Sequence, residues 1–351
     1  LEFVANFGRL NKRMHNKIMV MDNAAAIIGG RNIADEYFGV GEVQNNRDLD
    51  IVAVGPVVRD ISSTFDEFWN SPAAVPIEAI VKEKPSIEDF RRQLASLRSE
   101  MKPERYHFPL EADLKTLRRR IEGMQGNLVW ARGEVLHDSI QSMKKKGAGP
   151  TLYGTLSQQM EGAKEELLIE SAYFVVQPPA IEMVRRLTSR GVKVRTLTNS
   201  LASNNVLSAQ SGHSKYRRDL LEAGMELYEL RPDAASVMRQ VAPQGRNSTI
   251  TLHSKTLVID GDRAFVGSFN LDPRSVNINS EIGLMVYSPV FARKVKDFLE
   301  EGIRPENAYH VTLRGRGLQW SSVEDGQTRT WTRDPETSGF RRFKAGAIEL
   351  L

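Results

Sequence analysis

The chain has 351 residues, carries 48 Lys and Arg against 44 Asp and Glu, for a formal net charge of +4, and contains no cysteine. This length exceeds one ordinary domain and suits two, and a hydrophobic content of 40% supports a sizeable core. The lack of thiols excludes disulfides, thiolate nucleophiles and zinc–cysteine sites. No apolar run approaches the roughly 18 residues that a membrane-spanning helix needs, and the small positive excess is compatible with an anionic partner without requiring one.

The N-terminal part opens with Leu1 rather than Met, and a strand is expected almost at once, at MHNKIMVMD (14–22). We therefore expect the sequence to be a fragment, with any targeting or anchoring segment absent from it. Residues 48–58 (DLDIVAVGPVV) predict a further strand, followed by a helix with Pro56 in its first turn. The apolar residues after this proline recur at helical spacing and predict one buried helix face.

The middle of the chain, residues 75 to 145, is charged and predicted to be helical, and it carries no recognisable motif. Runs of basic residues stand at 118–120 and 144–146, and again at 341–342. We interpret these runs as solvated faces rather than as membrane contacts.

The C-terminal part begins with alternating strand and helix signals. Strands are predicted at 165–176, 192–200 and 225–230, and helices at 179–191 and 214–224. The helices end on Gly191 and Gly224, as helices often do. This order predicts a largely parallel sheet covered by helices.

A repeat relates the two parts of the chain. LHSKTLVID (252–260) repeats MHNKIMVMD (14–22), and the turns that follow them, at 29–32 and 267–270, also align. Further on, EIGLMVYSPVF (281–291) matches residues 48–58. Only 14 residues precede the first histidine of the pair, so the first copy lacks most of the lead-in that the second copy has. Missing strands of this kind predict an exposed sheet edge and a tendency to aggregate.

The repeated motifs place chemistry-bearing side chains at matched positions. Residues i and i+2 of a strand share a face, so His15 is expected beside Lys17, and His253 beside Lys255. Asp22 and Asp260 have the opposite parity and are predicted to be structural acceptors at the strand ends. In the turns, Asn32, Asn270, Ser268 and Gly30 are expected to bind phosphate. Glu281 and Asp48 are predicted to accept a proton from a histidine ring and fix its tautomer, although Asp50 competes with Asp48 for that role.

Two imidazoles, two ammonium groups and two amides around a pseudo-two-fold axis suit the chemistry of phosphate diesters. One imidazole attacks phosphorus, and the other protonates the leaving alkoxide and then activates an alcohol or water. The lysines and amides neutralise the phosphoryl oxygens. No metal or other cofactor is expected.

Other candidates are weaker. His213 either lines the substrate entrance or is a solvated loop residue. Tyr173 and Phe174 are predicted to pack in the core, with contact to lipid as the alternative. The remaining histidines, His107, His137 and His310, are interpreted as ordinary surface or core residues.

The pattern H-x-K-x4-D followed by G-[GS]-x-N occurs twice and resembles the phospholipase D superfamily. The segments 11–38, 170–178, 198–205, 220–232 and 334–343 are similar to bacterial cardiolipin synthases of the C type. This resemblance implies an α/β fold of two similar phospholipase D-like domains, with mixed β-sheets flanked by helices and the active site at the pseudo-two-fold interface. Residues 1–74 would be the C-terminal part of the first domain, 75–148 a charged helical connector, and 149–351 the second domain.

The resemblance also implies a function. It predicts a peripheral enzyme of the bacterial cell membrane that makes cardiolipin from phosphatidylglycerol and a second phospholipid, with His15 as nucleophile and His253 as acid and base. Its partners would be phospholipids and the membrane surface, not nucleic acid. Many relatives have Ser where Gly30 stands, so this chain is expected to lack one hydroxyl of the first phosphate clamp. Hydrolysis of phospholipids, metal-independent nuclease activity and a binding module with a decayed site are the alternatives.

Overall fold

The computed structural model describes residues 11–84, 86–100, 114–144, 149, 151–242 and 248–349. The strands are β1 Ile18–Met21, β2 Ala25–Gly29, β3 Gln44–Arg47, β4 Asp50–Val54, β5 Arg132–His137, β6 Glu166–Ser171, β7 Lys193–Asn199, β8 Glu226–Leu230, β9 Thr249–Leu252, β10 Lys255–Ile259, β11 Arg263–Gly267, β12 Ile282–Tyr287, β13 Ala308–Arg314, β14 Gly317–Glu324 and β15 Gln327–Trp331. The helices are the short 3-10 turn η1 Asp35–Tyr37, α3 Val57–Trp69, α4 Ile77–Ile80, α5 Ile87–Glu100, α6 Leu114–Gln125, α7 Ile140–Lys144, α8 Leu152–Glu161, α9 Pro178–Ser189, α10 Leu207–Glu222, α11 Ala235–Val241, α12 Pro273–Asn277, α13 Pro289–Gly302 and α14 Gly339–Glu349.

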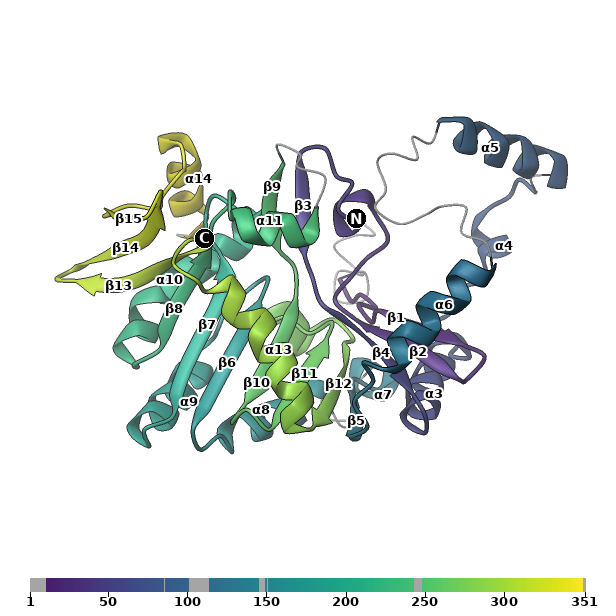
Figure 1. Cartoon of the computed structure of the whole chain (residues 1–351), viewed down its shortest axis with the longest axis horizontal. Coiled ribbons are helices and arrows are strands. Elements are labelled where there is room, and N and C mark those ends of the chain that lie inside the picture. The colour runs from purple at the N-terminus through teal and green to yellow at the C-terminus, as the bar shows by residue number, and fades with distance from the viewer. Residues whose placement is uncertain are drawn as a thin grey trace.

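Within these residues the largest element is a ten-stranded mixed sheet in the order β15-β14-β13-β8-β7-β6-β10-β11-β12-β5 (Figure 1). Only the β6–β7 and β7–β8 pairs, which helices α9 and α10 connect, are parallel. The expectation of a largely parallel sheet is therefore wrong beyond β6–β8. Short turns join β10 to β11 and β13 to β14, and a tight turn can connect only antiparallel neighbours.

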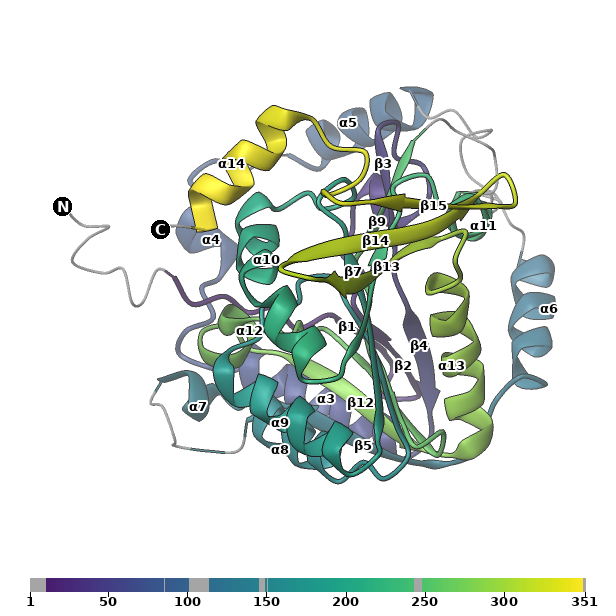
Figure 2. The same cartoon turned by 90° about the vertical axis from the view of Figure 1, so that its left-hand side faces the viewer.

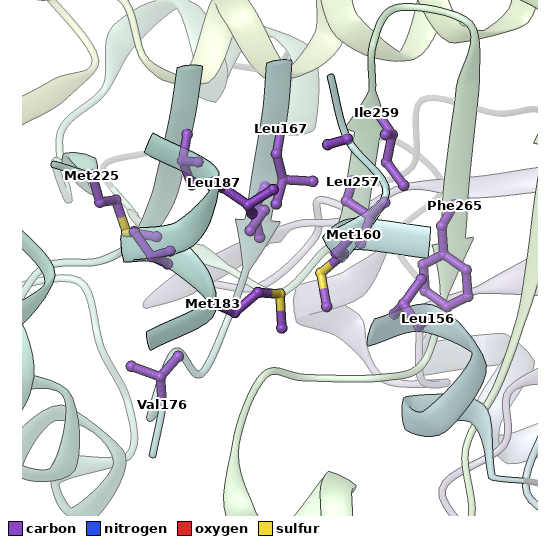
Figure 3. Packing of buried hydrophobic residues seen from close by; sticks show 14 of the residues in the cluster. Leu156, Met160, Leu167, Val176, Met183, Leu187, Met225, Leu257, Ile259 and Phe265 are labelled. Carbon is purple, nitrogen blue, oxygen red and sulfur yellow. The ribbon is translucent and has the colours of Figure 1, made fainter. Parts of the chain in front are cut away.

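Both faces of the central strands are buried, which explains their nearly continuous apolar sequence. Leu167 and Ile169 of β6 pack with helices α8 and α9 on one face, whereas Leu168 between them packs with α13 on the other. Leu257 and Val258 of β10 divide between the two faces in the same way. Figure 2 shows α8 and α9 on one side of the sheet and α13 on the other. Figure 3 shows how the buried side chains on the α8 and α9 side, Leu167 among them, pack together.

The first repeat forms a separate antiparallel sheet in the order β1-β2-β4. Ala26 and Ile28 of β2, with Ile61 of α3, pack against Leu284 and Val286 of β12 in the larger sheet. Strands β1 and β4 are the outer strands of this small sheet. Among the described residues, the sheet of the first repeat thus has three antiparallel strands with helix α3 beside it, and is not the mixed sheet that was expected.

Two short parallel contacts join the repeats. Strand β3 of the first repeat pairs with β9 of the second, ending at the pair Arg47–Leu252. An isolated bridge between Met14 and Ser280 makes the equivalent connection on the other side. Each contact therefore brings the residue just before a motif histidine next to the residue just before a predicted carboxylate.

The connector departs from the prediction, because it is not wholly helical. Its strand β5 pairs with β12 and forms one edge of the large sheet. At the opposite edge, β13 to β15 extend the sheet by antiparallel strands that the sequence patterns did not suggest. The basic run at 118–120 lies exposed on α6, whereas residues 145 and 146 lie outside the described part. Within the described residues, no helix combines the length and apolarity needed to cross a bilayer.

Candidate active site

The motif histidines lie beside strands rather than within them, which corrects the expectation of one continuous strand per motif. Strand β9 ends at Leu252 and β10 begins at Lys255, so His253 occupies the passage between two different sheets. In the first repeat β1 begins at Ile18, after both His15 and Lys17. Each lysine nevertheless lies next to its histidine. Lys17 Nζ donates to the carbonyl oxygen of His15 at 2.8 Å, and Lys255 Nζ donates to that of His253.

Backbone hydrogen bonds hold each histidine against the other repeat. The amide of His253 donates to the carbonyl oxygen of Arg47 at 2.8 Å, and the amide of His15 donates to that of Ser280 at 3.0 Å. The next residues along the chain are Asp48 and Glu281 respectively. The backbone therefore delivers a carboxylate to each imidazole.

The two carboxylates bind the imidazoles reciprocally across the repeats. His253 Nδ1 lies 2.7 Å from Asp48 Oδ2, and His15 Nδ1 lies 2.8 Å from Glu281 Oε2. Both acidic side chains are fully buried. A carboxylate accepts hydrogen bonds, so in each pair Nδ1 carries the proton and Nε2 is the nitrogen left for chemistry. Asp50 does not compete for this role, because it binds Arg31 instead.

The hydroxyl of Ser268, which was expected to bind phosphate, is engaged with a carboxylate in this structure. It is fully buried, lies 2.5 Å from Glu281 Oε2 and accepts the amide of Ile282 at 3.0 Å. Ser275 Oγ donates to the other oxygen of Glu281 at 2.7 Å. With both lone-pair regions occupied in this way, Glu281 is held in one orientation toward His15.

Gly30, the counterpart of Ser268, makes room for the other carboxylate. A Cβ atom at this position would lie 2.4 Å from Asp48 Oδ1. The glycine at this position therefore has a steric consequence beside the expected loss of a hydroxyl. It allows Asp48, which has a shorter side chain than Glu281, to lie directly against the turn.

The two motif asparagines have different partners. Asn32 Nδ2 donates at 2.8 Å to the hydroxyl of Tyr37, which lies 3.4 Å from His253 Nε2. The rings of Tyr37 and His253 meet edge to face, with centroids 4.9 Å apart. Asn270 is buried and accepts the amide of Tyr173 at 3.4 Å. Sequence reasoning missed Tyr37, because the second repeat has Ser275 at the matching position and the repeat pattern gave no signal.

Burial controls the charges in the site. Burial and the nearby charge of Lys255 lower the pKa of Lys17 to about 8, and burial lowers that of Lys255 to about 8 although Asp48 and Glu281 oppose the shift. Burial and Lys255 also lower the pKa of His253 to about 4. Burial would raise the pKa of Asp48, but the hydrogen bond from His253 and the nearby positive charges of Lys255 and Arg31 together outweigh it and lower this pKa. At neutral pH the site therefore holds a neutral His253 beside an ionised Asp48.

A buried ion pair between Arg47 and Glu170 lies beside the backbone of His253. Arg47 Nε lies 3.2 Å from Glu170 Oε1, and both side chains are inaccessible to solvent. Ser254 Oγ also donates to Glu170, and the ring of Phe298 lies 3.8 Å from the Arg47 guanidinium. The corresponding contact beside His15 is uncharged: Ser280 Oγ donates to Asn16 Oδ1 at 2.7 Å. The two halves of the site are thus supported differently.

Asp22 and Asp260 both adopt positive φ angles of 52° in the turns that follow their strands. Asp260 accepts backbone amides from Lys164, Glu165 and Glu166 at 2.8–3.1 Å and pairs with Arg263 at 3.2 Å. Asp260 therefore fixes the start of β6, and within the described residues no hydrogen bond or ion pair links it to the motif histidines.

His213 is neither at an entrance nor in a solvated loop, because residues 207–222 form helix α10. It is buried and lies 3.0 Å from the carbonyl oxygen of Phe174 and 3.1 Å from Glu229 Oε1. Phe174 packs in the core, whereas the partly buried Tyr173 donates its hydroxyl to Asn205 Oδ1 at 3.3 Å.

The other histidines lie apart from the paired imidazoles. His107 lies outside the described residues. His137 forms a contact of 3.7 Å with Glu67, and His310 stacks on Tyr228. In the described part of the chain, no group of three or more His, Asp or Glu side chains is arranged to hold a metal ion.

Two carboxylate-held imidazoles beside one buried and one partly buried ammonium group define a site for nucleophilic and acid–base chemistry on an anionic group. Comparison with known proteins agrees with this class. The family described as "Cardiolipin synthase, PLD-like domain" matches residues 156–302. Cardiolipin synthase C of Escherichia coli is 33% identical over the whole chain, which covers 74% of that protein. An uncharacterized protein of Helicobacter pylori is 29% identical over 97% of the chain, which covers 67% of it.

The solved structure of phosphatidylserine synthase from Haemophilus influenzae superposes on 96% of this chain and 67% of its own, with a TM-score of 0.55 and 13% identity. At this identity the likeness concerns the fold alone. The sequence relationship is sufficient for the assignment: the chain belongs to the phospholipase D superfamily of enzymes, and it is similar to the cardiolipin synthases of that family.

Proposed function

We propose that this protein is a cardiolipin synthase that transfers a phosphatidyl group from phosphatidylglycerol to a second phospholipid through a covalent phospho-histidine. The observation that carries the proposal is the reciprocal pairing of His15 with Glu281 and of His253 with Asp48. The name of the Escherichia coli relative supports the choice of substrate. In this proposal the two repeats act as halves of one site around a pseudo-two-fold axis.

In the first step His15 Nε2 attacks the phosphorus of phosphatidylglycerol. A P–N bond forms and the P–O bond to the glycerol headgroup breaks, while His253, whose Nε2 takes up a proton from solvent when the anionic substrate binds, gives that proton to the leaving glycerol oxygen. Glu281 stabilises the positive charge that develops on His15. Lys17 and Lys255 lie near the motif histidines and neutralise the phosphoryl oxygens.

In the second step a hydroxyl of the incoming phospholipid attacks the phospho-histidine. His253 removes the hydroxyl proton, a new P–O bond forms, and the P–N bond to His15 breaks. Cardiolipin leaves, and both imidazoles return to their starting protonation states. Water in place of the phospholipid would yield phosphatidic acid by the same route.

The assignment of His15 as nucleophile rests on accessibility. Its side chain is 27% exposed, against 8% for His253, and Nε2 of His253 already faces the hydroxyl of Tyr37. The low pKa of His253 means that its ring must gain a proton before it can act as the acid. A bound phosphodiester supplies a negative charge that raises this pKa.

The proposal places the protein at the surface of the bacterial cell membrane as a peripheral enzyme, with phospholipids as its partners. Nucleic acid is not expected as a substrate. A chain that acts on bilayer lipids needs a surface that contacts the bilayer, and the buried ammonium groups then select the anionic phosphodiester from the headgroup region.

The test is to incubate the protein with phosphatidylglycerol, separate the lipids, and locate acid-labile phosphate on the trapped enzyme by peptide mass spectrometry. Cardiolipin as product and label on His15 are expected. Phosphatidic acid without cardiolipin would make the protein a phospholipase, and release of nucleotides from DNA in EDTA would make it a nuclease. Label on His253 would reverse the two roles. Because His15→Ala and His253→Ala are both expected to abolish synthesis, substantial turnover by either variant would refute the mechanism.

A further inference from the structure

Helix α14 exposes two phenylalanines on one face. Phe340 and Phe343 are 66% and 72% exposed, and their spacing of three residues puts them on the same side of the helix. The other side of α14 is packed: Ala345 is buried, and its carbonyl oxygen accepts a hydrogen bond from Ser211 of α10 at 2.8 Å. The helix is therefore fixed to the protein with its aromatic face toward solvent.

The same helix carries three positive charges. Arg341 donates to the carbonyl oxygens of Leu201 and Asn204, and Arg342 donates to Thr337, while Lys344 Nζ lies 4.4 Å above the ring of Phe340. These partners are neutral. Among the residues that the structure describes, none of the three cations is paired with a carboxylate. Arg341 and Arg342 are half-buried at the base of the helix, and the exposed Lys344 places an uncompensated positive charge beside the two aromatic rings.

Helix α14 is connected to the candidate active site through one loop. Arg341 holds residues 201–204 of this loop, and the next residue, Asn205, accepts the hydroxyl of Tyr173. Tyr173 in turn donates its amide to the motif residue Asn270. Figure 2 shows α14 on the opposite side of the molecule from α13.

We propose that the exposed face of α14, formed by Phe340, Phe343 and Lys344, is the surface by which this protein docks on an anionic phospholipid bilayer. Aromatic rings on one face of an amphipathic helix, flanked by cations, are typical of helices that lie in the membrane interface. The rings enter the boundary between headgroups and acyl chains, and the cations meet the lipid phosphates. The inference rests on the proposed function for its choice of lipid, and it deepens that function by naming the docking surface.

The test measures binding of the full 351-residue chain to sedimented vesicles of phosphatidylglycerol and phosphatidylcholine, and to vesicles of phosphatidylcholine alone. The variant with Phe340→Gln and Phe343→Gln is expected to bind anionic vesicles at least about tenfold more weakly. Lys344→Gln is expected to weaken binding to anionic vesicles roughly fivefold and leave binding to neutral vesicles unchanged.

A matched control replaces two apolar residues near α13, Val290→Gln and Trp130→Gln, which are exposed to a similar extent. Wild-type binding by this control is expected. The proposal is overturned if the wild-type chain ignores anionic vesicles, or if the phenylalanine variant binds them as the wild type does. If sedimentation velocity finds the wild-type chain to be a dimer and the phenylalanine variant a monomer with intact vesicle binding, the face is instead assigned to a second copy of the chain.

Turnover is measured separately, on lipid dispersed in detergent micelles, where docking on a bilayer is not needed. The phenylalanine variant is expected to keep wild-type turnover there, since none of its changed residues touches the motif histidines. Vesicle binding without any lipid turnover would refute the proposed function and would still support the docking surface. Turnover in micelles without vesicle binding would support the proposed function and refute the docking surface.

Discussion

Asp48 and His253 lie 205 positions apart in the chain and are joined by a hydrogen bond of 2.7 Å. The reciprocal bond between His15 and Glu281 spans 266 positions. Each imidazole therefore depends on the other repeat for its orientation and its tautomer. Among the described residues, each motif histidine finds its carboxylate in the other repeat and not in its own, which explains why the repeats must meet for the site to exist.

Asp48→Asn is expected to lower turnover by on the order of 10²–10⁴-fold with little change in fold, because an amide in place of the carboxylate no longer enforces the Nδ1–H tautomer of His253. Steady-state kinetics with phosphatidylglycerol measure the loss. Asp50→Asn is the matched control, since Asp50 binds Arg31 and not a histidine. Equal losses in the two variants would contradict the role given to Asp48.

Ser268→Ala is expected to lower kcat about tenfold and leave KM almost unchanged, because the hydroxyl orients Glu281 and does not bind phosphate. A rise in KM with kcat preserved would restore the phosphate-clamp interpretation. Kinetics over a range of lipid concentrations in micelles separate the two outcomes.

Gly30→Ala is expected to disturb the other half of the site, because the added Cβ would lie 2.4 Å from Asp48 Oδ1. Asp48 must then move away from His253, and turnover is expected to fall with the fold largely kept. The variant with Gly30→Ala and Asp48→Asn tests the cause. If displacement of Asp48 explains the loss, the double variant is no less active than Asp48→Asn alone.

Turnover is expected to fall as the pH rises above about 8, since the pKa values of Lys17 and Lys255 are lowered to about 8. The charged form of a lysine exists below its pKa, so raising the pH removes the positive charge that neutralises the phosphoryl oxygens. A pH–rate profile measures the alkaline limb. In the Lys17→Arg variant the arginine keeps its charge to much higher pH. The fall in turnover at alkaline pH is therefore expected to be less steep than in the wild type, because only Lys255 loses its charge there. An alkaline limb that is identical in this variant would exclude Lys17 as its source.

Arg47→Met or Glu170→Met alone is expected to lower the free energy of unfolding by about 3–5 kcal/mol, because each leaves an unpaired charge in a fully buried position. The double variant is expected to recover most of that stability and to remain impaired in turnover, since the side chain of Arg47 no longer anchors the strand whose backbone holds His253 and leads into Asp48. Denaturant unfolding and lipid kinetics on the same samples separate stability from positioning. Full activity in the stable double variant would show that the ion pair is only structural.

A matched control comes from the other half of the site. Asn16→Ala removes the uncharged contact with Ser280 and is expected to cost about 1 kcal/mol. A loss as large as that of the single charge variants would contradict the difference inferred between the two halves.

Local patterns predicted a large part of the fold and of the site. Helices α9 and α10 end next to Gly191 and Gly224, which adopt φ angles of +82° and +89° that favour glycine, and glycine marks such positions in any sequence. The prediction that His and Lys of each motif lie side by side is also confirmed. They do not share one strand face, however, because each histidine lies outside the strand that follows it. Helical periodicity was not recognised around His213, which led to the wrong expectation of a loop there.

The sequence by itself determined which residue types are available to the reaction, because a duplicated motif can be recognised in the amino-acid sequence alone. Only the tertiary structure decided how they are paired. It assigned Asp48 to His253 and Glu281 to His15, gave the Ser268 hydroxyl to Glu281 and placed Tyr37 against His253. The physical reason is that these contacts join residues far apart in the chain, through the packing of two repeats against each other. Such packing depends on buried area and backbone pairing across the whole molecule, and no short stretch of sequence contains it.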